Sequence, residues 1–172
     1  MTTPLEDLFT RVRAEKRAAL IAYIPAGFPT ITDCHRVIQA FVDGGVDAIE
    51  IGYPYSDPVM DGPTIQEAAV TALNNGTKAA DVFSALEVAV KAGVPSVVMT
   101  YWNPIEKYGV DTFAAEIAKH PRAKKFALVT KTDTVNKKTL ADRLMTISDL
   151  AQGFQWDEII PVSAVIHDQI EL

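Results

Sequence analysis

Two carboxylates close together in the sequence give this 172-residue chain its clearest chemical signal. Glu50 lies in residues 46–51, a largely apolar run that predicts a buried strand. Asp61 follows on a loop rich in proline and glycine, and residues 63–67 after it are typical of a helix start. A carboxylate near the C-terminal end of a parallel strand, with a second on the following loop, is how a βα-barrel enzyme presents catalytic acids. We therefore expect acid–base chemistry at this rim.

A purely structural interpretation of the same loop is the alternative. Asp57 before Pro58 is a common turn former, and Asp61-Gly62 is a common turn before a helix. Neither turn explains Glu50, because a parallel strand covered on both faces favours apolar residues throughout. Glu50 is therefore the residue that most needs a functional explanation.

Strand and helix patterns alternate along the whole chain. Strands are expected at residues 18–23, 48–51, 94–101, 126–130 and 158–162. Helices are expected from about residue 5, from a cap at Thr32, over residues 65–73, from Thr77, and over residues 110–119 and 137–152, with a turn at Asn103-Pro104. The alternation predicts an α/β fold with parallel strands. Five strands cannot close an eight-stranded barrel, so we expect a partial (βα) barrel or an open parallel sheet of about five strands with flanking helices.

Composition disfavours several function classes. The chain has 16 basic and 22 acidic residues and a net charge of −6, which disfavours non-specific nucleic-acid binding by the chain as a whole. Seven basic residues fall between 119 and 138, where a solvated face is favoured over an RNA contact. No apolar run has membrane-spanning length, and no signal-peptide pattern occurs. The single Cys34 cannot form an internal disulfide, and the three histidines lack metal-ligand spacing. We expect a cytoplasmic protein without a metal, a cofactor or a membrane partner.

Residues from about 5 to 116 resemble the N-terminal part of the tryptophan synthase alpha chain. Three motifs carry the resemblance: Leu20-Ile-Ala-Tyr-Ile-Pro-Ala-Gly-Phe-Pro29, residues 50–66, and Met99-Thr-Tyr-Trp-Asn-Pro104. That family is a βα-barrel (TIM-barrel) lyase of tryptophan biosynthesis. It cleaves indole-3-glycerol phosphate to indole and glyceraldehyde 3-phosphate, and it passes the indole to a beta chain. The resemblance therefore implies this substrate and a tryptophan synthase beta chain as partner.

The resemblance also implies a role for individual residues. Glu50 would be the general acid/base that moves protons between the indole ring carbon and the glycerol hydroxyl. Asp61 would hold the indole N–H and offset the positive charge that develops on the ring. Tyr23 and Tyr101 match substrate-binding positions that line the pocket. The family binds the substrate phosphate in loops from the second half of its barrel, which have no counterpart here, so we expect impaired catalysis.

Residues from about 117 to 172 resemble the latter part of an Era-type GTPase domain. The run Ala127-Leu-Val-Thr-Lys-Thr-Asp133 is similar to the guanine-specificity motif, which implies that Lys131 packs along the base and Asp133 accepts from its N–H groups. The run Pro161-Val-Ser-Ala164 is similar to a later loop, in which Ser163 and Ala164 would contact the guanine. Thr130 stands where most GTPases have Asn, and the sequence contains no G-x-x-x-x-G-K-[ST] phosphate loop.

Together the two resemblances predict a division of the chain. Residues 1–116 would form an incomplete alpha-chain-like (βα) barrel part, and residues 117–172 a GTPase-like βαβ segment packed in the same domain. Three functional hypotheses follow: an impaired lyase, a guanine-nucleotide-binding or ribosome-assembly GTPase fragment without a P-loop, and a non-functional fusion or truncated product. An unclosed sheet would also expose edge strands and favour self-association.

Overall fold

The computed structural model describes residues 2–58, 61–119, 126–131 and 158–163. The chain forms two compact units, Met1–Gly109 and Val110–Leu172. The expected α/β class with parallel strands is confirmed, and the five described strands lie in two sheets of three and two strands. The first unit holds the three-stranded sheet and all four of the predicted lyase residues.

Helices and strands of the first unit alternate as the sequence predicts. In chain order they are α1 (Pro4–Ala14), β1 (Ile21–Pro25), α2 (Ile31–Asp43), β2 (Ala48–Gly52), α3 (Pro63–Asn74), α4 (Ala79–Lys91), β3 (Ser96–Met99) and α5 (Trp102–Tyr108). The strands run parallel in the order β1-β2-β3, so β2 is the central strand. Their C-terminal ends therefore lie at one edge of the sheet, where the loops leading to α2, α3 and α5 begin.

The register of the three strands separates two faces of the sheet. Tyr23 lies opposite Glu50, and Glu50 lies opposite Val97, so these residues form one row. The neighbouring row, one residue later in each strand, is Ile24, Ile51 and Val98. Because side chains alternate along a strand, the two rows project from opposite faces.

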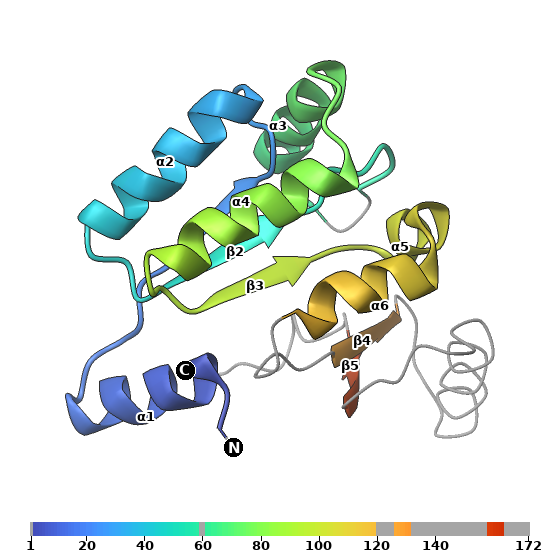
Figure 1. Cartoon of the computed structure of the whole chain (residues 1–172). Coiled ribbons are helices and arrows are strands. Elements are labelled where there is room, and N and C mark those ends of the chain that lie inside the picture. Colours follow the sequence, from blue (N-terminus) through green and yellow to red (C-terminus); the bar gives the residue numbers. More distant parts are fainter. Residues whose placement is uncertain (1, 59–60, 120–125, 132–157, 164–172) are drawn as a thin grey trace. The chain divides into compact units, whose positions relative to one another are not determined.

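One face of the sheet packs against α2 and α4, which lie next to each other along it (Figure 1). The buried residues of this core are Ile24, Ala26, Cys34, Ile38, Ile49, Ile51, Val82, Ala85 and Ala89. Each large aliphatic side chain buried here contributes roughly 1.5–3 kcal/mol to folding. Helix α1 has its own contacts, because Leu8 and Val12 pack on Ala48 at the start of β2. The row that contains Glu50 projects from the face opposite the α2–α4 core.

The predicted cap of α2 at Thr32 is wrong, because Thr30 has that role. The Thr30 hydroxyl accepts a hydrogen bond from the backbone N–H of Asp33 at 3.1 Å, and the helix begins at Ile31. An N-cap side chain satisfies the free N–H groups of the first turn. Thr30 stands three residues before Asp33, which is the spacing that this bond requires, whereas Thr32 already lies inside the helix.

A helix also replaces the turn predicted at Asn103-Pro104. Both residues lie in the first turn of α5, and the helix ends at Tyr108, followed by the C-cap residue Gly109 with a φ of 102°. The first N–H groups of a helix have no intrahelical partner, so Pro104 costs no hydrogen bond at this position. Proline in a first turn is therefore compatible with a helix that the sequence pattern did not predict.

The second unit contains α6 (Val110–Ala118), β4 (Phe126–Lys131) and β5 (Glu158–Ser163). The two strands are parallel, with Phe126 opposite Glu158 and Lys131 opposite Ser163. Among the described strands, β4 pairs with β5, and β3 pairs with β2. The predicted helix at 137–152 and the predicted residues Asp133 and Ala164 lie outside the described residues. In the part of the chain that the structure describes, no helix is long and apolar enough to cross a membrane.

Candidate active site

Glu50 is held by the central strand of the first sheet. It stands in the middle of β2, where its neighbours Ile49 and Ile51 are fully buried and Glu50 itself is half-buried. Both sides of β2 are paired with other strands, which fixes the backbone at Glu50. The carboxylate therefore projects from a rigid position that is partly removed from water.

Tyr23 lies over the C-terminal end of the same strand. A methyl group added at Gly52 would come within 2.2 Å of the Tyr23 hydroxyl oxygen and 2.7 Å of the ring. Glycine is thus the residue that lets the tyrosine ring approach the backbone of β2 this closely. Glu50 and Tyr23 stand opposite each other in the register of β1 and β2. The first two predicted site residues are therefore neighbours.

Asp61 is held by the beginning of α3. Its backbone N–H donates to the carbonyl of Pro58 at 3.0 Å. The side-chain amide of Gln66, on the first turns of α3, donates to the carbonyl of Asp61 at 2.9 Å and to that of Pro58 at 3.3 Å. These bonds hold the backbone on which the half-buried carboxylate of Asp61 stands.

The causes of the pKa shifts show that the four predicted lyase residues lie near one another. Burial raises the pKa of Glu50, and repulsion from Asp61 raises it further. Burial also raises the pKa of Asp61. Burial, followed by the charges of Asp61 and Glu50 and the nearby Tyr101, raises the pKa of Tyr23 to about 12. Two carboxylates whose ionised forms are disfavoured and a tyrosine that keeps its proton therefore lie in one cluster, and perturbed groups of this kind are typical of functional sites.

Tyr101 is joined to a residue that the sequence did not single out. Its ring lies 4.9 Å from the ring of Tyr55, centroid to centroid, with the planes tilted by 34°. The side-chain amide of Asn103 donates to the Tyr55 hydroxyl at 2.7 Å. Both Tyr55 and Asn103 fall inside the motifs quoted above, but they stand 48 positions apart in the sequence, so no local pattern indicates their contact.

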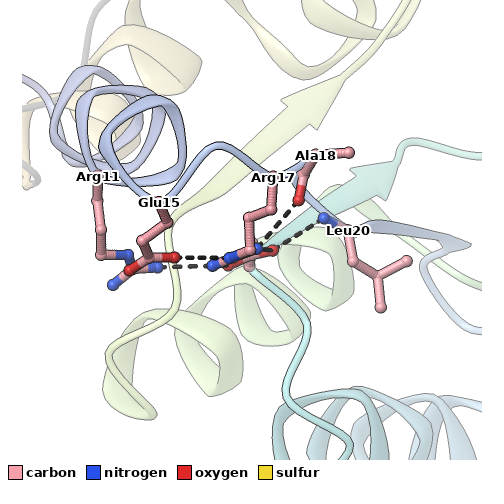
Figure 2. A network of polar contacts seen from close by, with 6 residues as sticks. Arg11, Glu15, Arg17, Ala18 and Leu20 are labelled. Atoms are coloured by element: carbon pink, nitrogen blue, oxygen red, sulfur yellow. Dashed lines mark hydrogen bonds and ion pairs between the residues drawn. The ribbon is translucent and has the colours of Figure 1, made fainter.

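A third carboxylate, Asp47, lies just before β2 and was missed because it stands in the apolar run. It is buried, and both guanidinium Nη atoms of Arg17 donate to it at 2.6 and 2.7 Å. The Leu20 N–H donates at 2.9 Å, and Arg11 lies within 3.4 Å. Figure 2 shows the side chains of Arg11, Arg17 and Glu15 gathered there. Arg17 and the Leu20 N–H lower the pKa of Asp47, so this group is a structural anion that fastens α1 to β2.

The predicted nucleotide-binding residues are only partly within the described chain. Lys131 and Ser163 end β4 and β5 at the same level of their pairing. Asp133 and Ala164 follow these strands and lie outside the described residues. Among the described residues, no cluster of His, Cys, Asp or Glu could hold a metal ion.

Comparison with known proteins gives consistent matches. A family model described as tryptophan synthase alpha chain matches residues 9–129. The tryptophan synthase alpha chain of Thermobifida fusca is 54% identical over 116 residues, which are 67% of this chain and 43% of that protein. That of Streptomyces coelicolor is 52% identical over 115 residues, or 66% of this chain and 42% of that protein. The chain thus spans less than half the length of these relatives.

A solved structure also resembles the chain. The aminoacrylate-bound form of tryptophan synthase from M. tuberculosis matches with a TM-score of 0.70 and 34% identity. The match covers 93% of this chain and 71% of the solved chain.

Proposed function

The chain belongs to the tryptophan synthase alpha chain family, and we propose that its site is built for that family's lyase reaction, the cleavage of indole-3-glycerol phosphate to indole and glyceraldehyde 3-phosphate. The observation that carries the proposal is the placement of Glu50 and Asp61. They share an electrostatic environment at the C-terminal edge of the sheet, with Tyr23 and Tyr101 beside them. The three-stranded sheet and its helices correspond to part of the βα barrel of the family.

The reaction would use the two carboxylates differently. The carbon–carbon bond to the glycerol chain breaks after a proton is added to the indole ring carbon and as a proton leaves the glycerol hydroxyl, so the ring first becomes cationic. Glu50, whose raised pKa brings it closer to neutral pH, would move these protons. Asp61, anchored through Gln66, would accept from the indole N–H and offset the positive charge.

The two tyrosines would bind the indole rather than move protons. With a pKa of about 12, Tyr23 keeps its proton at neutral pH and adds no third negative charge to the site. The Tyr101 ring, tilted against Tyr55, offers an aromatic surface to a flat substrate. Both are proposed as substrate-binding residues on these grounds.

We expect low activity for the chain by itself. The family's phosphate-binding loops belong to the second half of its barrel, and the matched residues 9–129 lie in the first part. Remote contacts of this kind supply binding energy that positions the reacting centre. A low kcat/KM with indole-3-glycerol phosphate is therefore the expected result.

Indole release from indole-3-glycerol phosphate tests the proposal. Glu50→Gln keeps the shape of the side chain and removes its acid–base capacity, so it should abolish release. Glu87→Gln, the same change at an exposed position of α4, is the matched control and should leave the rate unchanged. Release that survives Glu50→Gln would remove Glu50 from the mechanism.

A tryptophan synthase beta chain is the proposed partner, and the cytoplasm is the proposed location. The loop over residues 54–62 resembles the segment that contacts the beta chain in this family. Co-elution with a beta chain in size-exclusion chromatography tests the partnership. Loss of co-elution in a Pro58→Ala variant, with its melting temperature unchanged, would support contact through this loop, and no co-elution of the unmodified chain would contradict it.

Guanine-nucleotide binding by the second unit is the other candidate function. The parallel pairing of β4 and β5 favours it, because Lys131 and Ser163 stand opposite each other at the strand ends, where the two guanine motifs would meet. Without a phosphate loop only base contacts remain, so titration with labelled GDP should give a Kd weaker than about 10 μM, or about 7 kcal/mol. Lys131→Ala should weaken binding further. A chain with neither indole release nor GDP binding would favour the third hypothesis, a non-functional fusion.

A further inference from the structure

Two loops at the C-terminal edge of the first sheet are tied together by Tyr55. Tyr55 stands on the loop after β2, and its ring packs on that of Tyr101, the N-cap residue of α5, at 4.9 Å. Its hydroxyl accepts a hydrogen bond from the Asn103 amide at 2.7 Å, in the first turn of the same helix. The hydrogen bond and the ring contact, which we call the Tyr55 bridge, therefore join the loop after β2 to the start of α5.

The loop that the Tyr55 bridge holds is the one that carries Asp61. On the far side of Asp61, Gln66 donates to the carbonyls of Asp61 and Pro58. Asp61 thus lies between two anchors along the chain, the Tyr55 bridge before it and the Gln66 amide after it. A backbone held on both sides restricts where a half-buried carboxylate can point.

The Tyr55 bridge also fixes an aromatic ring of the site. Tyr101 is close enough to Tyr23 to raise its pKa, so the ring that Tyr55 packs against belongs to the same cluster as Glu50 and Asp61. A movement of Tyr55 would therefore disturb Asp61 through the loop and Tyr101 through ring packing.

We propose that Tyr55 and Asn103 are positioning residues, which hold the Asp61 loop against α5 so that Asp61 and Tyr101 meet the same bound indole. The inference rests on the proposed lyase function and adds a specific pair of residues to it. Neither residue transfers a proton. Their effect is on the alignment of Asp61, and misalignment of a charge that acts mainly in the transition state lowers kcat more than it raises KM.

The test uses Tyr55→Phe, which removes the hydroxyl and keeps the ring, together with Asn103→Ala and the double variant. The backbone N–H of Asp61 donates to the Pro58 carbonyl. In Tyr55→Phe its hydrogen exchange with solvent, measured by NMR, should become roughly tenfold faster. This factor corresponds to the loss of one ordinary hydrogen bond. The N–H of Tyr53, which donates to Met99 at 2.8 Å, should keep its rate. In the indole-release assay, kcat should fall roughly tenfold at nearly constant KM.

Coupling and a matched control separate this role from a general loss of structure. Because both residues act through one bond, Asn103→Ala should add little to Tyr55→Phe in exchange and in kcat. Tyr108→Phe is the matched control at another position of α5. It keeps the ring contact with Phe83 of α4, and it should change neither the exchange rate of Asp61 nor kcat. Melting temperatures of all variants within a few degrees of the unmodified chain show that the fold is kept.

The outcomes distinguish this proposal from the one on which it rests. Faster exchange at Asp61 together with a lower kcat in Tyr55→Phe supports it. Unchanged exchange and kcat in both single variants overturn it, even if the unmodified chain cleaves the substrate. No indole release from the unmodified chain overturns the proposed function and with it the catalytic role of Tyr55 and Asn103, whatever the exchange rates are.

Discussion

Two carboxylates, Asp47 just before β2 and Glu50 in the middle of β2, have opposite electrostatic environments. Asp47, at the start of the strand, receives two hydrogen bonds from Arg17 and one from the Leu20 N–H, and its pKa is lowered. Glu50, three residues later, loses water and faces the charge of Asp61, and its pKa is raised. Only one of the two carboxylates is therefore stabilised as an anion by the fold.

The difference separates a structural charge from a chemical one. A carboxylate whose hydrogen-bond positions are filled cannot exchange protons near neutral pH, so Asp47 serves to hold α1 on the sheet. A carboxylate that is desolvated and repelled keeps unfavourable energy that a substrate can relieve, and such groups cluster at functional sites. The rest of the domain has to supply the stability that the site lacks.

Replacement of Asp47 should have the largest effect of any change at either end of β2. Asp47→Asn removes the buried anionic partner of Arg17, leaving only the exposed Glu15, and replaces one acceptor by a donor. We therefore expect the largest fall in the free energy of unfolding, measured by urea denaturation. Glu15→Gln, which removes only the exposed partner of Arg17, should cost much less. Equal losses for the two variants would show that Asp47 is not the centre of the network.

The lowered pKa of Asp47 should make the folded chain less stable as the pH falls below about 4. Because the pKa of Asp47 is lower in the folded chain, its stabilisation is present above the ordinary aspartate value of about 4 and is lost as the pH falls from there toward the lowered value. Melting temperatures measured from pH 7 downward should thus fall less steeply for Asp47→Asn than for the unmodified chain. Parallel curves would contradict this assignment.

At the other end of the strand, Gly52→Ala should have the next largest effect. The new methyl group would meet the Tyr23 ring, which must move, and overpacking of this kind costs roughly 1–3 kcal/mol. Indole release should fall with it, because Tyr23 leaves its place beside Glu50. Gly62→Ala is the matched control, since a methyl group there meets no atom of the described residues within 4 Å, and it should cost less than about 1 kcal/mol.

Glu50→Gln should change stability in the opposite direction to Asp47→Asn. The raised pKa means that the folded chain disfavours the ionised form, so the penalty is absent below the ordinary glutamate value of about 4.3 and grows as the pH rises through the raised value. At pH 7 the glutamine variant should therefore be slightly more stable in urea denaturation, and at pH 4 the difference should vanish. A less stable variant at pH 7 would mean that Glu50 has a structural role like that of Asp47.

The smallest effect on stability is expected for an exposed ion pair outside β2. Lys91 and Glu87 are 2.9 Å apart on α4, with 73% and 57% of their side chains exposed. Lys91→Gln should cost about 0.3–0.5 kcal/mol in urea denaturation. A loss as large as that from Asp47→Asn would show that burial does not determine how much an ion pair contributes to the free energy of unfolding of this chain.

Local patterns predicted the elements of the fold better than their ends. The alternation of strands and helices, the strand that carries Glu50 and the helix start after Asp61 all follow from apolar spacing and from proline. The third strand was predicted over residues 94–101, yet only Ser96–Met99 forms β3, because pairing with β2 decides its length. Strand ends depend on the partner strand, which a local pattern does not contain.

The contacts that sequence reasoning missed are long-range ones. Arg17 and Asp47 are separated by 30 residues, and Tyr55 and Asn103 by 48. In the sequence, Arg17 is one of several cations near the end of α1, and Asn103 precedes a proline, so both suggested local roles. Only the folded sheet, which brings its loops to shared edges, reveals their partners.

The pairing of Tyr23 with Glu50, and of Glu50 with Val97, has a further consequence for how the chain folds. If β2 slipped by one residue against its neighbours, Glu50 would turn inward among the aliphatic side chains under α4, and Ile51 would take its place at the rim. Burying an unpaired carboxylate among apolar groups is strongly unfavourable, so the misaligned sheet could not persist. The acid proposed to cleave the substrate would then also disfavour the wrong strand register during folding.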